Sequence, residues 1–204
     1  TVVVKASTLI SVQPAGASIC PGSSHTLSVT ASGEGVLSYQ WTLNGITING
    51  ATSSSYKTSA AGNYAVSVTG ECGTVTSSVA TVALLKSTAI LSQPQGGAIC
   101  DGSNLSLRVS ADGEGTLSYQ WYKQNQLLTG DTSFAYTATT GGSYTVVVTG
   151  ICGSVTSNPA LVSINALTTI TRQPVDTSVT YGDNADFNVQ ATGTGTLSYQ
   201  WQVS

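Results

Sequence analysis

The sequence predicts an all-β chain made of tandem β-sandwiches, and three observations carry this prediction. The first is a repeat with an offset of 80 residues, clearest in Tyr39-Gln40-Trp41, Tyr119-Gln120-Trp121 and Tyr199-Gln200-Trp201. The second is an alternation of apolar and polar residues with the two-residue period of half-buried strands. The third is the spacing of glycine-rich turn signals between these segments, which is typical of sandwiches.

Two complete repeats and parts of two others account for the whole chain. Residues 7–86 and 87–166 are identical at about half of their aligned positions, and each is expected to form one domain. Residues 1–6 resemble the tail of a preceding copy and are expected to form its terminal strand. Residues 167–204 match the N-terminal half of a third domain. The chain is therefore expected to be a segment of a longer repetitive protein.

The strands of the first repeat can be followed along the sequence. Leu27–Ala31 alternates first, Leu37–Trp41 follows, and Tyr64–Thr69 comes after a longer gap. The turn residues Gly33-Glu34-Gly35 separate the first two segments. Turn signals at a spacing of about 8–12 residues indicate roughly seven short strands in each repeat. No segment places apolar residues at helical spacing.

This pattern resembles an immunoglobulin domain of the I-set kind. Trp41 matches the tryptophan of strand C, and Tyr64 matches the tyrosine-corner residue of strand F. Val29 and Val66 stand where such domains usually carry a disulfide, so an apolar pair packed on tryptophan is expected instead. The core implied by the resemblance consists of Trp41, Trp121, Trp201, Tyr64, Tyr144, Val29, Val66, Val109 and Val146.

A longer pattern is more specific. It reads Gln-Pro, Ile-Cys-x-Gly-Ser, Gly-x-Leu-Ser-Tyr-Gln-Trp and Val-Thr-Gly-x-Cys-Gly-x-Val-Thr-Ser. It resembles the tandem repeats of very long bacterial surface proteins, including gliding-motility adhesins exported by the type IX route. The resemblance implies a non-enzymatic, extracellular adhesin or stalk on a bacterial cell surface, with its domains arranged end to end. Its implied partners are the neighbouring repeats and surface polysaccharide or other cells.

Two alternative functions remain open at this point. The repeats could be a spacer array of a secreted enzyme that degrades polysaccharide. They could also form a filament subunit that polymerises by exchanging strands. A catalytic domain beside the repeats would favour the first alternative, and a chain that ends after half a domain would favour the second.

Composition argues against several other classes of function. Charged residues make up 7% of the chain, and the formal net charge is −3. Six Lys and Arg residues cannot form a basic stripe, so we expect no nucleic-acid partner. No apolar run is long enough to span a bilayer, so we expect no membrane insertion. Hydrophobic residues reach 40%, which is enough for a packed core.

The sequence offers no catalytic or metal-binding set. His25 is the single histidine, and the second repeat has Leu105 at the equivalent position. Glu34 and Glu114 recur in the turns after strand B, but the third copy has Thr194 there. We therefore expect no catalytic residue, no metal and no cofactor.

Four cysteines recur at matched positions and predict disulfides in an oxidising compartment. Cys20 matches Cys100, Cys72 matches Cys152, and Thr180 replaces the cysteine in the third copy. Reduced thiols are the alternative. Which of the four pair with each other depends on the direction of the strands.

Strand direction in the immunoglobulin topology argues against pairing within a domain. Strands B and F run the same way, Cys20 precedes strand B, and Cys72 follows strand F. They are then tens of ångströms apart, on the order of the length of the sandwich, whereas a disulfide needs Cα atoms within about 7 Å. The prediction is an interdomain Cys20–Cys152 bond, with Cys72 and Cys100 bonded to flanking repeats. Pairing within each domain remains the alternative. Because the strands leave almost no linker between repeats, we also expect a stiff connection.

Overall fold

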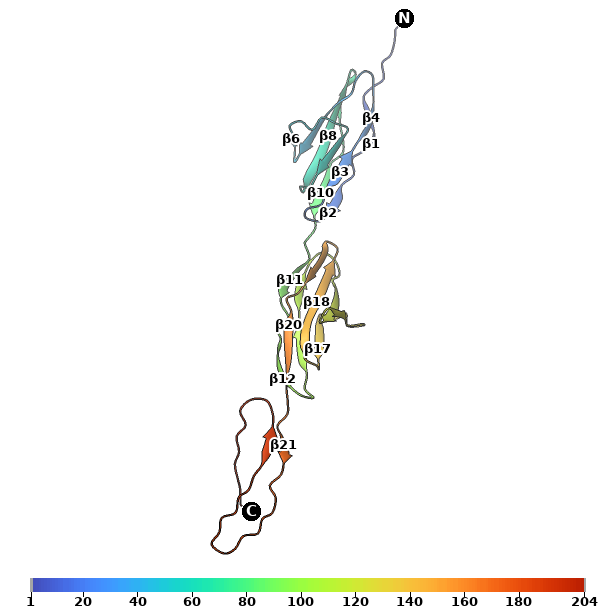
Figure 1. Cartoon of the computed structure of the whole chain (residues 1–204). Helices are drawn as coiled ribbons and strands as arrows, with labels where there is room; N and C mark the ends of the chain where they lie inside the picture. The colour runs from blue at the N-terminus through green and yellow to red at the C-terminus, as the bar shows by residue number, and fades with distance from the viewer. Residues whose placement is uncertain (1, 204) are drawn as a thin grey trace. The chain divides into compact units, whose positions relative to one another are not determined.

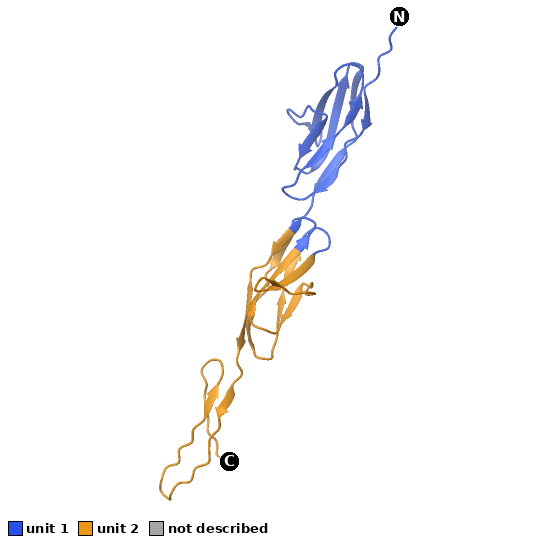
Figure 2. Ribbon diagram, turned by 45° about the vertical axis from the view of Figure 1, so that its right-hand side comes forward, with its two compact units in different colours: residues 1–88, 112–117, 149–153 blue, residues 89–111, 118–148, 154–204 orange. Residues whose placement is uncertain are grey.

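The computed structural model describes residues 2–203, and every regular element in that range is a β-strand (Figure 1). The chain forms two compact units (Figure 2). The first contains residues 1–88, 112–117 and 149–153, and the second contains residues 89–111, 118–148 and 154–204. No helix in the described range could cross a membrane.

The first repeat contains ten strands. They are β1 (Leu9–Val12), β2 (Ala17–Ile19), β3 (His25–Ser28), β4 (Thr30–Ser32), β5 (Ser38–Leu43), β6 (Ile46–Thr47), β7 (Ser55–Thr58), β8 (Gly62–Gly70), β9 (Gly73–Thr76) and β10 (Ala80–Leu84). One layer of the sandwich consists of the pairs β1–β4 and β3–β7. The other layer has the strand order β2-β10-β8-β5-β6, with β9 also paired to β8.

The expected number of about seven strands is too low because three expected strands are divided. Two of them change partner along their length, and the third is interrupted between β9 and β10, which both pair with β8. The segment Leu27–Ala31 divides into β3, which pairs with β7, and β4, which pairs with β1. The first strand divides as well, because the segment after Pro14 leaves β1 and joins the other layer. There β2 runs parallel to β10, with Ala17 opposite Val82. An alternation of apolar residues shows which face is buried but not which strand lies alongside.

The second repeat reproduces this arrangement. Its strands are β11 (Ala89–Ser92), β12 (Gly97–Cys100), β13 (Leu105–Arg108), β14 (Ser110–Asp112), β15 (Ser118–Lys123), β16 (Gln126–Leu127), β17 (Ala135–Ala138), β18 (Gly142–Gly150), β19 (Gly153–Thr156) and β20 (Ala160–Asn165). The pairs β11–β14 and β13–β17 form one layer, and β12-β20-β18-β15-β16 form the other. The third copy contributes β21 (Thr169–Arg172) and β22 (Gln190–Thr192), which pair with each other.

The core of the first repeat lies between its two layers. Trp41 on β5 is fully buried, and it stands opposite Val66 of β8. The indole nitrogen of Trp41 donates a hydrogen bond of 2.9 Å to the carbonyl of Ser53, so its one polar atom is satisfied. Val29 and Tyr64 are also buried. Their counterparts in the second repeat, Val109, Trp121, Tyr144 and Val146, are buried in the same way.

Trp201 differs from the core residue that the sequence predicts, because 53% of its surface is exposed. It borders a hollow of about 360 Å³ that Ile170 and Leu197 also line. In the first repeat, Trp41 stands opposite Val66 of β8, and its ring lies 6.2 Å from that of Tyr56 on β7. Residues 167–203 contain no counterpart of these strands, so this apolar face is an incomplete core.

Residues 2–6 form no strand in this chain, and their assignment with Thr1 to the terminal strand of a preceding repeat stays a prediction. Val2, Val3 and Val4 are exposed, because the described chain offers them no sheet to join. The remaining residue of that prediction, Thr1, lies outside the described range.

Candidate functional site

Cys20 occupies the first position of a tight turn between β2 and β3. The amide of Ser23 donates to the carbonyl of Cys20 over 3.0 Å, with Pro21 and Gly22 between them. Gly22 has a φ of 82°, which a type II turn requires at its third position and which favours glycine. The sequence therefore fixes the Cys20 backbone at the end of the sandwich.

Cys152 lies in the two-residue loop between β18 and β19. The loop consists of Ile151 and Cys152, and Gly153 follows it with a φ of 101°. A two-residue hairpin loop holds its side chains in a defined place, since both flanking strands are paired. Cys72 occupies the equivalent loop between β8 and β9.

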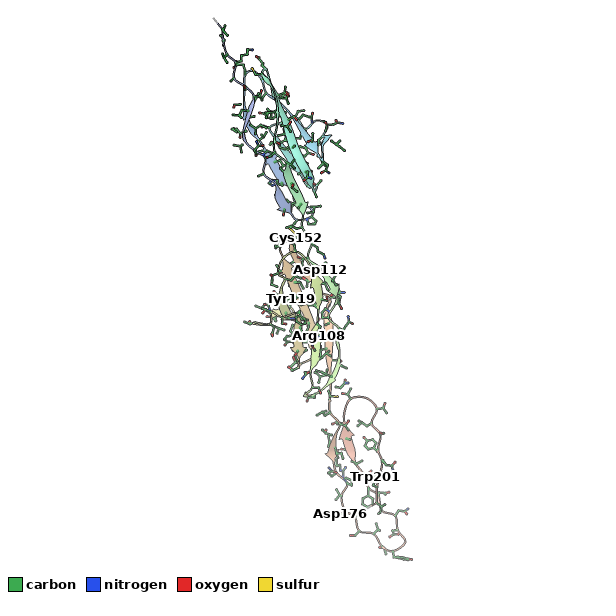
Figure 3. The ribbon with its side chains drawn as sticks, turned by 180° about the vertical axis from the view of Figure 1, so that it is seen from behind. Arg108, Asp112, Tyr119, Cys152, Asp176 and Trp201 are labelled. Carbon is green, nitrogen blue, oxygen red and sulfur yellow. A yellow bond between two sulfur atoms is a disulfide. The ribbon has the colours of Figure 1, made fainter. Side chains whose placement is uncertain are left out.

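The structure joins Cys20 to Cys152 by a disulfide, although the two residues are 132 positions apart in sequence. Their Cα atoms lie 5.3 Å apart, within the ordinary range for a disulfide. Both residues belong to the first compact unit, and Cys152 is labelled in Figure 3. Cys72 and Cys100 are exposed free thiols in this structure.

An ion pair lies in the same unit as the disulfide. The Nζ atom of Lys86, in the segment between β10 and β11, contacts a carboxylate oxygen of Asp112. The hydrogen bond from Lys86 holds the pKa of Asp112 below its ordinary value of 3.8. The backbone amide of Lys86 also donates to a carboxylate oxygen of Glu114 at 3.5 Å. The segment between the repeats is therefore attached to a turn of the second repeat by side-chain and backbone contacts.

A similar attachment follows the second repeat, but it is formed by uncharged residues. The amide of Ala166 donates to Oγ1 of Thr194 over 2.7 Å. The amide of Thr194 donates back to the carbonyl of Ala166 over 3.3 Å. Ala166 and Thr194 are the 80-residue counterparts of Lys86 and Glu114. A backbone contact at this position is thus a feature of the repeat, and the Lys86–Asp112 pair is an addition to it.

Sequence reasoning missed the role of Lys86. The recurrence of Glu34 and Glu114 raises only the question of a metal site and does not point to the cation that faces the turn. The signal was present, because Lys86 is one of only six Lys and Arg residues and precedes a turn that holds Asp112 and Glu114.

His25, the single histidine, has a structural contact. His25 is the first residue of β3, and its Nε2 atom lies 3.0 Å from the carbonyl oxygen of Ala15. Within residues 2–203, no group of three His, Cys, Asp or Glu side chains is placed so that it could hold a metal ion. The distinctive interactions among the described side chains are thus one disulfide and two ion pairs, Lys5–Glu71 and Lys86–Asp112.

Comparison with solved structures establishes the fold. A three-domain I-band fragment of titin matches with a TM-score of 0.65 and 12% identity, covering 96% of this chain and 78% of the fragment. Domains 1–5 of Sidekick-1 match with a TM-score of 0.54 and 21% identity. This match covers 93% of the chain but only 46% of the Sidekick-1 structure. The chain is a tandem array of immunoglobulin-like β-sandwiches.

Sequence comparison adds no family to this result. No family model matches the chain, and no curated protein matches it. The insect immune protein hemolin, whose structure is described with implications for homophilic adhesion, matches with a TM-score of 0.50 and 12% identity. The match covers 79% of this chain and 48% of hemolin. At such low identities these likenesses concern the fold alone.

Proposed function

We propose that this chain is a non-enzymatic segment of a bacterial cell-surface adhesin or stalk, which extends or presents an adhesive surface. Residues 7–86 and 87–166 are its two complete domains in this proposal. The observation that carries it is the Cys20–Cys152 disulfide, which joins one repeat covalently to the next. A covalent tie between successive domains suits a protein that must carry load, because it limits their separation without depending on weak contacts.

The disulfide also supports an extracellular location. Disulfides persist in oxidising compartments and are rare in reducing cytosol. The likeness to long bacterial surface repeats, including those exported by the type IX route, is the reason for choosing a bacterial surface among extracellular settings. Its neighbouring repeats are the first partners of the segment in this proposal, and surface polysaccharide or other cells are the second.

The free thiols extend the proposal to flanking repeats. Cys72 lies in the hairpin loop of the first repeat that is equivalent to the Cys152 loop of the second. Cys100 begins a turn in the second repeat that is equivalent to the Cys20 turn of the first. We propose that Cys72 bonds to a preceding repeat and Cys100 to a following one. Each repeat boundary would then carry one tie of the same kind.

Antibody labelling of intact cells of the source organism tests this function. An antibody raised against residues 7–166 is expected to label cells that have not been permeabilised. In-frame deletion of the same residues is expected to reduce attachment to a surface while the shortened protein is still exported. Labelling that appears only after permeabilisation would overturn the proposal, and so would a deletion that leaves attachment unchanged.

A further inference from the structure

A second feature of the molecule lies on the second repeat. A hollow of about 450 Å³ is bordered by Arg108, Phe134, Tyr119, Ser92 and Ser110. All five residues belong to the second compact unit, and Figure 3 labels Arg108 and Tyr119. The hollow is open to solvent, so a ligand would lie against it rather than be enclosed.

The strand register brings the cation and the aromatic ring together. β13 and β17 are antiparallel, with Arg108 opposite Ala135. Just beyond this pair, the amide of Val109 donates to the carbonyl of Phe134 over 3.0 Å. The guanidinium carbon of Arg108 lies 6.0 Å from the centre of the Phe134 ring, at the outer limit of a cation–π contact.

The fold does not need either side chain. The first repeat has Ser28 where the second has Arg108, and Ser54 where it has Phe134. The backbone is nevertheless the same, because the amide of Val29 donates to the carbonyl of Ser54 over 2.9 Å. The sandwich therefore forms with serine at both positions, and the second repeat has gained an arginine and a phenylalanine beyond what it requires.

Both side chains remain available to a ligand. Phe134 is 51% exposed, so its ring contributes little to the core. No carboxylate in the described part of the chain forms an ion pair with Arg108. The exposed ring and the guanidinium beside it are therefore both open to a ligand.

The chemistry of the hollow selects a class of ligand. A guanidinium presents a planar fork of donors that matches a carboxylate with two parallel hydrogen bonds. The exposed ring offers an apolar face on which the C–H face of a sugar can pack, and the hydroxyls of Ser92, Ser110 and Tyr119 can bond sugar hydroxyls. We propose that this hollow binds a carboxylate-bearing sugar, such as a uronic acid residue of an acidic polysaccharide. The site supplies a ligand class for the adhesive surface of the proposed function and rests on that function for its biological setting.

Titration of the whole chain with tri-galacturonic acid, followed by amide chemical shifts, tests this assignment. Galactotriose serves as the neutral probe. We expect the acidic trisaccharide to shift the amides around Arg108 and Phe134, with a Kd on the order of 1 mM for a shallow, open site. The neutral trisaccharide is expected to bind much more weakly, because it leaves the guanidinium without a partner.

The first repeat supplies variants that should keep the fold. Arg108→Ser and Phe134→Ser copy its residues, and each is expected to weaken binding about tenfold or more, as expected for central arginine and aromatic contacts. Lys57→Ser removes an equal charge from β7 of the first repeat and is expected to leave binding unchanged. The combined change Val12→Ser, Ser28→Arg and Ser54→Phe is expected to give the first repeat a comparable site, because Thr30 and Tyr39 already match Ser110 and Tyr119.

Three results would overturn the assignment. They are equal affinity for the two trisaccharides, unchanged binding by Arg108→Ser, and no shift at about 10 mM acidic trisaccharide, some ten times the expected Kd. None of these bears on whether the segment is displayed on cells. Failure of surface labelling with intact sugar binding would instead remove the proposed function and leave the site.

Discussion

Cys20 and Cys152 come from different repeats, yet their Cα atoms lie 5.3 Å apart and their sulfur atoms are bonded. Each occupies a tight turn whose geometry a glycine supports, Gly22 in one case and Gly153 in the other. The bond therefore joins two backbone positions that are already well defined. The following predictions separate what holds each repeat together from what holds one repeat to the next.

The tryptophan cores should be independent of each other. Trp41→Ala is expected to destabilise the first repeat by about 3–5 kcal/mol, because it empties a fully buried site and removes the hydrogen bond to Ser53. Trp121→Ala should do the same to the second repeat, and each change should affect the other repeat less.

Denaturant unfolding followed by tryptophan fluorescence measures this independence. In a Trp201→Phe background, Trp121 alone reports the second repeat when Trp41 is removed, and Trp41 alone reports the first when Trp121 is removed. A loss of about 3–5 kcal/mol in the repeat that keeps its tryptophan would show that the two repeats unfold as one unit.

The tyrosine corner should contribute through its hydroxyl group. The Tyr64 hydroxyl donates to the carbonyl of Ala60 over 3.0 Å and lies 2.7 Å from Oγ1 of Thr58. Tyr64→Phe leaves these partners less satisfied and is expected to cost about 1–2 kcal/mol in free energy of unfolding. Tyr122→Phe, on a less buried tyrosine, is the matched control and should change little. An equal loss of unfolding free energy in the two variants would show that the hydrogen bonds of the Tyr64 hydroxyl add no measurable stability.

Acid should weaken the attachment between Lys86 and Asp112. The pKa of Asp112 is lowered chiefly by its hydrogen bond with Lys86, so the folded state favours the carboxylate. The ion pair therefore contributes to folding stability at neutral pH. This contribution is lost as the pH falls below 3.8 and through the lowered pKa of Asp112. The effect on stability should be small, because both groups are exposed to solvent.

An NMR titration of the Asp112 carboxyl carbon checks this cause directly. Lys86→Met is expected to bring the pKa of Asp112 back toward 3.8, and Lys57→Met is expected to leave it where it is. A pKa that stays low in Lys86→Met would assign the shift to some other group.

The isolated segment should catalyse no hydrolysis or group transfer. His25 is its single histidine, and Nε2 of that residue lies 3.0 Å from the Ala15 carbonyl oxygen, so its contact is structural. His25→Ala is expected to cost about 1 kcal/mol of stability at most and to change no activity. Turnover of a polysaccharide substrate that His25→Ala abolishes, with the fold intact, would contradict this.

Much of the fold follows from residue spacing, and the exceptions have physical causes. Alternation correctly indicates that Leu27 and Val29 face the core, since both are buried. It does not show that the strand around them changes partner between β3 and β4, because pairing depends on which neighbour is available. Trp201 was expected in a core for the same reason as Trp41, but burial requires covering strands that residues 167–203 do not include.

The candidate sites show a similar division. Strand direction in a resembled topology was enough to choose Cys152 as the partner of Cys20. The Lys86–Asp112 pair and the Arg108–Phe134 hollow were not foreseen, because both are departures from the repeat. The shared pattern of the repeats does not include such residues. They are found only where equivalent positions differ, as Arg108 differs from Ser28.

Peptide mapping of the purified chain under non-reducing conditions tests the central claim most directly. Free thiols are first alkylated, the chain is digested, and cross-linked peptides are identified by mass spectrometry. The structure predicts one cross-linked pair that contains Cys20 and Cys152, with Cys72 and Cys100 alkylated. Bonds from Cys20 to Cys72 and from Cys100 to Cys152 would contradict the account, since each tie would then lie within a repeat.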